Sequence, residues 1–170
     1  MIRKASARGE SRARSLPDLE VAFTIGPLIG RVRMVLLSAL DRELESFGVT
    51  GMQFAILKHL ADGPAETAAE LCRLLHYDTG SMTRLLDKLE ARRLIRRERS
   101  RSDRRLVSLR VTAAGRSLLP RLWDSAGRGV QHMLGGFRAA EISNLRDYLE
   151  RMIANGEPLR AHEAEEPEER

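Results

Sequence analysis

The spacing of apolar residues predicts a mainly helical chain. Between residues 19 and 47 they recur at intervals of three and four, which predicts one long helix with a wide apolar stripe, closed by Gly48. A second helix is predicted to start after Thr50 and to end at the Asp-Gly-Pro run 62–64. The same spacing returns after Thr112 and again over 139–154. The chain therefore begins and ends with long amphipathic helices.

Two shorter helices are predicted between these long ones. One covers 67–76, and the next runs from Thr79 to about Arg92, with Asp78 as its N-cap. In the second of them a buried stripe at the i, i+3, i+4 and i+7 spacing is formed by Met82, Leu85, Leu86 and Leu89. Two short helices joined by a tight turn, the second polar and basic on its exposed side, are typical of a helix-turn-helix.

After Leu94 the apolar period changes from about 3.6 to 2, as expected for strands. Val107, Leu109 and Val111 alternate with polar residues, and 95–99 can pair with them as an antiparallel strand across the polar turn 100–103. The predicted fold is therefore mainly α with a small β-hairpin wing, a winged helix-turn-helix flanked by N-terminal and C-terminal helices.

Positive charge is concentrated on this predicted wing. Residues 92–110 hold nine arginines against Glu98 and Asp103, a net +7, whereas the whole chain carries only +5. The two ends nearly cancel, because 1–16 carries +4 and 157–170 carries −4. A local positive field favours phosphate contacts, and arginine can also bind guanine or enter a narrow minor groove. The alternative is a solvated surface in a protein whose genome favours arginine, since the chain has 26 arginines and three lysines.

Other chemistry has little support in the sequence. Cys72 is the single cysteine, so it can form no intramolecular disulfide, and the four histidines have no metal-ligand spacing. Nothing resembles a nucleophile with its base or a phosphate loop, so we expect neither an enzyme nor a cofactor. The apolar stretch 21–40 is interrupted by Pro27, Arg31 and Arg33, which predicts a soluble, cytoplasmic protein rather than a membrane protein.

Three sequence blocks closely resemble the MarR family of bacterial transcriptional regulators. They are TGMQFAILKHLADG, YDTGSMTRLLDKLEARRLIRRE and SDRRLVSLRVTAAG, and the strong part of the resemblance covers Thr50 to Leu122. The terminal helices resemble the family only in length, position and periodicity. A helix-turn-helix followed by a D-x-R wing turn and a strand ending in T-x-x-G is a specific combination.

The resemblance implies a homodimer on a pseudopalindromic operator in double-stranded DNA. Within a single domain over 17–156, it assigns 50–112 to DNA binding and assigns 19–47 and 113–156 to dimerisation. The residues agree, because the long helices carry more apolar surface than the small helix-turn-helix part can cover. Outside the domain we expect a flexible basic arm over 1–16 and a disordered acidic tail over 157–170.

Roles can be proposed for the residues that meet DNA. On the second short helix, Arg84 is placed to bind guanine and Lys88 to bind phosphate, and the groove-facing residues beside them are Thr79, Ser81 and Thr83. The alternative for Arg84 is a surface ion pair with Asp87. At the wing the family pattern implies that Asp103 holds Arg105 extended into the minor groove, while Arg101 and Arg104 add phosphate contacts. The alternative there is a simple surface salt bridge at Asp103.

The resemblance also implies regulation by a small molecule. Many relatives are repressors released by a phenolic or aromatic carboxylate ligand, and we expect such a pocket near Arg31, Phe54, Lys58 and Trp123. Trp123 can instead belong to the dimer core. Three alternative functions remain: a sequence-neutral architectural nucleic-acid-binding protein, a redox-responsive regulator that senses through Cys72, and a protein-interaction module that has lost nucleic-acid binding. A buried structural thiol is the competing interpretation of Cys72.

Overall fold

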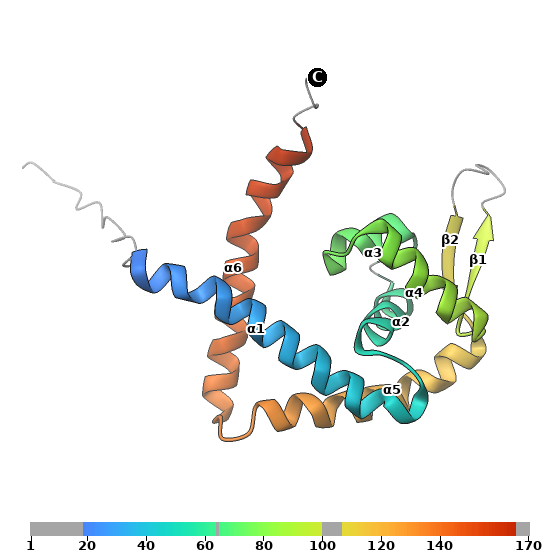
Figure 1. Ribbon diagram of the computed structural model, residues 1–170, viewed down its shortest axis with the longest axis horizontal. Helices are drawn as coiled ribbons and strands as arrows, with labels where there is room; N and C mark the ends of the chain where they lie inside the picture. Colours follow the sequence, from blue (N-terminus) through green and yellow to red (C-terminus); the bar gives the residue numbers. More distant parts are fainter. Residues whose placement is uncertain (1–18, 64, 100–106, 166–170) are drawn as a thin grey trace, which may run out of the picture.

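The computed structural model describes residues 19–63, 65–99 and 107–165, with side chains between Phe23 and Gly156. Its elements are α1 (Leu19–Leu44), the 3-10 helix η1 (Glu45–Phe47), α2 (Gly51–Asp62), α3 (Ala68–Leu75), α4 (Thr79–Ala91), β1 (Ile95–Arg99), β2 (Val107–Val111), α5 (Ala113–Met133) and α6 (Ala139–Glu165). Figure 1 shows α2, α3, α4 and the hairpin gathered at one end, with α1 and α5 leading away from them. The predicted mainly α fold with a small β-hairpin is confirmed.

Side-chain caps fix where the helices of the helix-turn-helix begin. The side chains of Thr50 and Thr67 each accept a hydrogen bond from the backbone N–H three residues ahead. In return, the side chains of Gln53 and Glu70 accept hydrogen bonds from the backbone N–H of Thr50 and Thr67, which completes a capping box at each helix. Asp78 accepts from the backbone N–H of Ser81 at the start of α4. The predicted caps at Thr50 and Asp78 are therefore confirmed, and they satisfy backbone donors that helix starts would otherwise leave unpaired.

The core lies where α2 meets the other elements. Its fully buried side chains come from α1, α2, α3, α4, β1 and α5, so no single element could be removed without opening it. The largest of them are Leu44, Ile56, Leu57, Leu71, Met82, Leu86, Leu89, Ile95 and Leu122. They are almost entirely aliphatic, as the scarcity of aromatic residues in the sequence requires. Burial of each large side chain contributes about 1.5 to 3 kcal/mol, so this cluster is the main source of stability.

The hairpin has the register that the alternating pattern predicts. Ile95 pairs with Val111 and Arg99 with Val107, in antiparallel orientation. Leu109 and Val111 point into the core, whereas Val107 at the outer end is 36 % exposed. The N–H of Leu109 also donates to the carbonyl of Glu66 at 2.7 Å, which ties β2 to the chain just before α3. The hairpin is therefore attached to the helix-turn-helix by backbone as well as by side chains.

The outer part of α1 is apolar but uncovered. Phe23, Val32 and Met34 are 78, 55 and 72 % exposed, and only the later part of the helix packs against α5. By length and composition, the segment Phe23–Phe47 could cross a membrane, the one such segment in the described part of the chain. The sequence analysis gave the opposite expectation because it counted Pro27, Arg31 and Arg33 as interruptions of the apolar stretch. Such a signal is weak by itself, since helices of soluble proteins also meet it.

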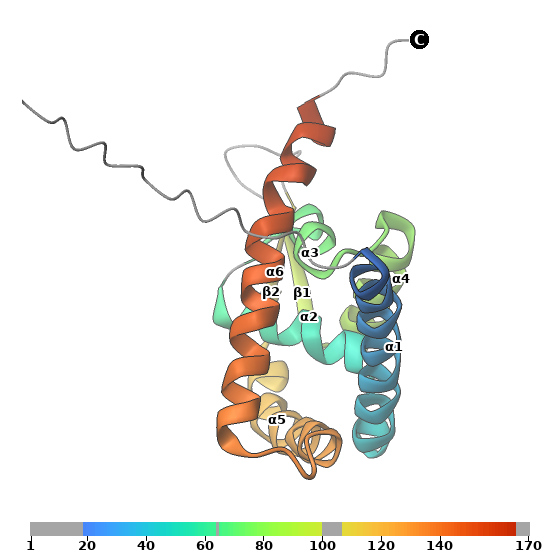
Figure 2. The ribbon, with the colours of Figure 1, turned by 90° about the vertical axis from the view of Figure 1, so that its left-hand side faces the viewer.

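Helix α6 runs further than the sequence predicted. We expected it to end near Ala154 and a disordered tail to begin at 157, but it continues to Glu165. The added segment is rich in Ala, Glu, Leu and Arg, which are good helix formers and outweigh Pro158. The helix has few contacts with the remainder of the described chain, and Figure 2 shows it standing apart from α1. Residues 166–170 and the arm 1–16 lie outside the described residues.

One glycine is required by close packing of α5 against the hairpin. A Cβ at Gly115 would lie 2.3 Å from the carbonyl oxygen of Leu94 and 2.7 Å from Cγ1 of Val111, so the backbone would have to shift. We expect Gly115→Ala to lower the free energy of unfolding by about 1 to 3 kcal/mol. The matched control is Gly127→Ala on the same helix, where no atom would lie within 4 Å of the new Cβ. There we expect a gain of about 0.5 to 1 kcal/mol in denaturant unfolding. Equal effects at the two sites would contradict this account.

Candidate nucleic-acid interface

Packing determines which face of α4 points outward. Met82, Leu86 and Leu89 are at most 1 % exposed and hold one side of the helix against the core. Arg84 and Lys88 are exposed and lie four residues apart, on the same side of the helix. Ser81 is half-buried, whereas Thr79 and Thr83 are exposed. Four of the five residues predicted to meet DNA are therefore exposed on a helix that is packed tightly against the core.

Local hydrogen bonds organise the start of this face. The guanidinium of Arg84 donates from Nη2 to Oγ of Ser81 at 2.8 Å, and the hydroxyl of Thr83 donates to the carbonyl of Thr79 at 2.8 Å. The backbone and side-chain hydrogen bonds from Ser81 lower the pKa of Asp78, which keeps this cap ionised at neutral pH. Ser81 thus holds the guanidinium of Arg84 in place.

The acidic residues of α4 are occupied by the hairpin. Arg97 on β1 pairs with Asp87 at 2.7 Å and with Glu90 through a short contact, and its backbone N–H also donates to Glu90. This differs from the sequence alternative in which Asp87 pairs with Arg84, because β1 brings Arg97 across the end of the helix. Among the described residues, Arg84 consequently has no carboxylate within ion-pair distance, although the charge of Asp78 is close enough to interact with it.

Two arginines just after α4 take part in hydrogen bonds to backbone carbonyls. Arg92 donates to the carbonyls of Phe47 and Gly48, where the chain leaves η1. Arg93 takes a left-handed conformation with φ of 57°, and its carbonyl accepts the hydroxyl of Thr112 at 2.6 Å. Arg92 therefore joins the end of α4 to the end of the long N-terminal segment, a contact between residues more than forty positions apart.

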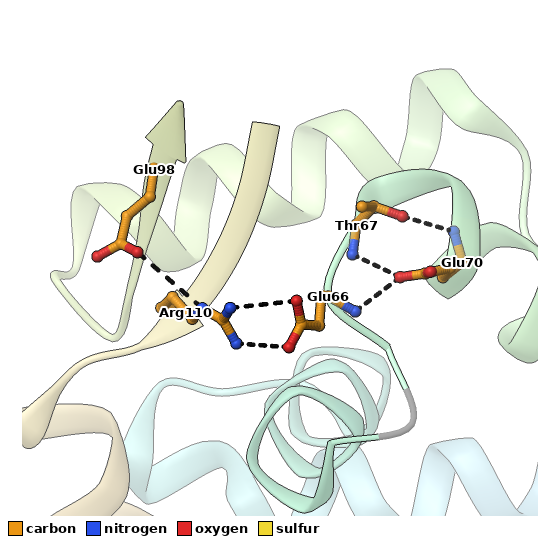
Figure 3. A network of polar contacts seen from close by, with 5 residues as sticks. All are labelled: Glu66, Thr67, Glu70, Glu98 and Arg110. Atoms are coloured by element: carbon orange, nitrogen blue, oxygen red, sulfur yellow. Dashed lines mark hydrogen bonds and ion pairs between the residues drawn. The ribbon is translucent and has the colours of Figure 1, made fainter. Parts of the chain in front are cut away.

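A second ionic contact joins β2 to the start of α3, as Figure 3 shows. Arg110 donates from Nη1 and Nη2 to the two carboxylate oxygens of Glu66, at 2.7 and 3.1 Å, and lies 4.0 Å from Glu98. The pKa of Arg110 is raised by Glu66. In turn Glu66 donates its N–H to Glu70, the residue that closes the capping box of α3. The hairpin is thus braced against both helices of the helix-turn-helix.

These contacts neutralise part of the positive charge of residues 92–110 within the protein. Arg97 and Arg110 are balanced by carboxylates from other elements, and Arg96 lies 2.6 Å from Glu98. Within the described hairpin, Arg99 makes no ion pair and is exposed, so it remains available to an anion. The predicted wing-tip residues Arg101, Asp103, Arg104 and Arg105 lie outside the described residues. Among the described residues of α4 and the hairpin, the exposed cations without an ion pair include Arg84, Lys88 and Arg99.

The residues that brace the hairpin were not predicted from the sequence. Asp87 was considered only as a partner of Arg84, Arg97 only as one of the clustered arginines, and Glu66 and Glu90 were not considered. Their partners are separated by 7 to 44 residues along the chain, so spacing on one helix gives no signal for them. The one available signal was that acidic residues occur close to the many arginines in this part of the sequence, which makes ion pairs possible without identifying the partners.

Three of the four predicted pocket residues lie together. Phe54, Lys58 and Trp123 line a cavity of about 410 Å³ between α1, α2 and α5, with Leu36, Leu40, Ala126, Gly127, Val130 and Gln131. The ammonium of Lys58 lies 5.2 Å from the centre of the Trp123 ring, and the Phe54 ring meets that indole edge-on at 6.0 Å. Arg31 does not line the cavity, because it is exposed on an earlier turn of α1. Its placement in the pocket was wrong. Cys72 is half-buried on α3, away from this cavity.

The arrangement defines a winged helix-turn-helix protein with an outward basic helix and a braced hairpin. A sequence model of the MarR family matches residues 47–106. HTH-type transcriptional repressor Mb2911 of Mycobacterium bovis is 33 % identical over 128 residues, covering 75 % of this chain and 92 % of the relative. The multiple antibiotic resistance protein MarR of Escherichia coli (strain K12) is 25 % identical over 130 residues, covering 76 % and 90 %.

A solved structure of a MarR mutant from E. coli, complexed with operator DNA, has the same fold. Its TM-score is 0.69, with 24 % identity over 79 % of this chain and 96 % of that one. The chain belongs to the MarR family, and it is a transcriptional regulator with a winged helix fold.

Proposed function

We propose that this regulator binds double-stranded DNA in a sequence-specific manner, with α4 in the major groove. The observation that carries the proposal is the outward face of α4, where neither Arg84 nor Lys88 is ion-paired within the described chain while Asp87 is held by Arg97. Exposed cations next to occupied carboxylates can approach a polyanion without losing an existing ion pair. The MarR mutant solved with operator DNA supports the proposal by its fold.

The side chains take different roles in this arrangement. Arg84, oriented by Ser81, presents a planar fork that fits O6 and N7 of guanine, a contact worth about 1 to 3 kcal/mol of discrimination. Lys88 and Arg99 meet phosphates, and Thr79 lies at the helix start. At the wing tip, the roles of Asp103 and Arg105 remain those implied by the family resemblance. A DNA-binding regulator acts at the chromosome, which places the protein in the bacterial cytoplasm.

We further propose that the protein acts as a homodimer through α1 and α6. Besides the exposed apolar face of α1, α6 exposes Tyr148, Met152 and Ile153 at 54, 46 and 61 %. Apolar helices that extend from a compact core with so little cover are typical of subunits that intertwine. A two-fold dimer would present two α4 helices to a pseudopalindromic operator, about 34 Å apart.

Finally, we propose that the protein is a repressor whose DNA affinity falls when a small aromatic carboxylate occupies the cavity beside Trp123. The cavity is mainly apolar, with Lys58 as its one charged residue and Gln131 as its one amide, a composition suited to a planar ring with one anionic group. It also lies between α1 and α5, the elements that would set the spacing of the two DNA-binding parts. The relative from M. bovis is itself named a repressor.

The role of α4 is tested by removing one exposed cation. In titrations of DNA from the upstream region of its own gene against a scrambled duplex, we expect Arg84→Ala to lower affinity for the native site by about 5- to 100-fold and to reduce discrimination. Arg138→Ala is the matched control, because it removes the same charge from the loop before α6, where Arg138 is bonded to Glu141. Similar losses in the two variants would favour the sequence-neutral architectural protein.

The dimer proposal is tested by placing a charge on α1. Val32→Glu should shift the sedimentation mass from about twice 19.1 kDa to 19.1 kDa, because a carboxylate cannot be buried unpaired in an apolar interface. Ser46→Glu adds the same charge at an exposed polar position of η1 and should leave the dimer intact. A wild-type protein that sediments as a monomer would exclude this assembly.

Ligand binding can be followed directly, because Trp123 is the only tryptophan. Salicylate should quench its fluorescence in a saturable way, and Lys58→Met should weaken binding by about tenfold, the effect of losing one charge-assisted contact. Arg31→Met should leave binding unchanged, since Arg31 lies outside the cavity. Quenching without saturation would show that this cavity does not bind such ligands.

A further inference from the structure

Glu66 uses all of its polar groups to connect α3 with β2. Its carbonyl accepts from the N–H of Leu109 at 2.7 Å, its N–H donates to Glu70 at 2.7 Å, and its carboxylate binds Arg110 with both oxygens. Figure 3 shows the contacts of Glu66 with Glu70 and Arg110 at the point where the chain enters α3. No other residue among those described links the first helix of the helix-turn-helix to the hairpin through both backbone and side chain.

Stability alone does not account for this contact. The side chains of Glu66 and Arg110 are 52 and 44 % exposed, and ion pairs with this exposure contribute little to folding because water and salt screen them. The core residues Leu109 and Val111 already anchor the inner end of β2. What the ion pair adds is a constraint on direction, since two parallel hydrogen bonds fix the guanidinium in one plane.

The direction of the hairpin matters because a small rotation at the Glu66–Arg110 pair produces a displacement of its outer end. Val107 lies roughly 10 Å further along β2 than Arg110, so a rotation of about 10° at the pair would move the outer end of the strand by roughly 2 Å. On the other side, Arg97 ties β1 to α4 through Asp87 and Glu90. Each strand therefore has an arginine ion-paired outside the hairpin, and together these contacts constrain the distance between the outer end of the hairpin and the exposed face of α4.

We propose that Glu66 is a positioning residue for DNA binding, holding Arg110 so that the hairpin meets the duplex while α4 lies in the major groove. The inference rests on the proposed DNA-binding function and adds a residue that does not itself touch DNA. A carboxylate would otherwise be unfavourable beside a polyanion, so its position in this network needs a reason of this kind.

The sign of the effect makes the proposal testable. Glu66→Gln removes one negative charge, so a purely electrostatic role predicts tighter DNA binding. Positioning predicts the opposite, a loss of roughly 3- to 30-fold for the native site. Glu141→Gln is the matched control, because it neutralises a carboxylate in another Arg–Glu pair, with Arg138 at 2.9 Å on the far side of the chain. The control should bind as tightly as wild type or slightly more tightly.

Charge exchange separates positioning from direct contact. Arg110→Glu should weaken binding, and the double variant Glu66→Arg with Arg110→Glu should recover most of it, because the pair is restored with its ends exchanged. If Arg110 instead contacted phosphate, the double variant would stay as weak as Arg110→Glu. Thermal midpoints should change by no more than about 3 °C in all variants, as expected for an exposed pair. An affinity loss that only follows a large fall in the midpoint would overturn the proposal.

The positioning role of Glu66 can also be tested without DNA, so that the result does not depend on whether the protein binds DNA. Nitroxide labels at Ala69→Cys on α3 and Arg99→Cys on β1, in a Cys72→Ser background diluted with unlabelled protein, report the hairpin angle by electron paramagnetic resonance. The distance distribution should be narrow with Glu66 and broader or shifted with Glu66→Gln. An unchanged distribution would overturn the positioning role, whether or not DNA binding is found.

Discussion

The burial of one side of α4 against α3, β1 and α2 is the contact on which the remaining structure depends. Met82, Leu86 and Leu89 are almost completely buried, so the helix cannot rotate without exposing them. This constraint leaves Arg84 and Lys88 facing outward. It also fixes the end of the helix, where β1 begins and where Arg92 reaches back to the end of η1. The side chains proposed to meet DNA are therefore positioned by buried apolar residues that do not contact DNA themselves.

The ion pairs between the hairpin and the helix-turn-helix depend on this packing, because it brings their partners together. Asp87, Glu90 and Glu66 would repel DNA if they were free, yet each is paired with an arginine of the hairpin. The pairs neutralise acids near the proposed interface and direct the hairpin at the same time. The large arginine count is thus divided between structural residues such as Arg97 and Arg110 and outward residues such as Arg84. That division explains how a chain with a net charge of only +5 can present a basic surface.

Local features were predictable from the sequence, and distant pairings were not. The cap at Asp78, the stripe on α4 and the alternation of Leu109 and Val111 depend on neighbours in sequence, so the elements could be placed closely. The partners of Arg97 and Arg110 depend on how separate elements meet, and one sequence carries no record of that. Arg31 was misplaced for a related reason, since its turn on α1 precedes the part that packs against α5. The length of α6 was underestimated because Gly156 and the acidic residues after it were weighed above helix propensity.

Interference by modified bases tests the central claim most directly. Duplexes selected by the full-length protein would be methylated at guanine N7, which lies in the major groove, and separated into bound and free fractions. If two α4 helices read the major groove, methylation should block binding at two clusters about 10 base pairs apart on one face of the duplex. Binding that is insensitive to N7 methylation and is blocked only by modified phosphates would contradict the account, because the protein would then contact the backbone and read no bases.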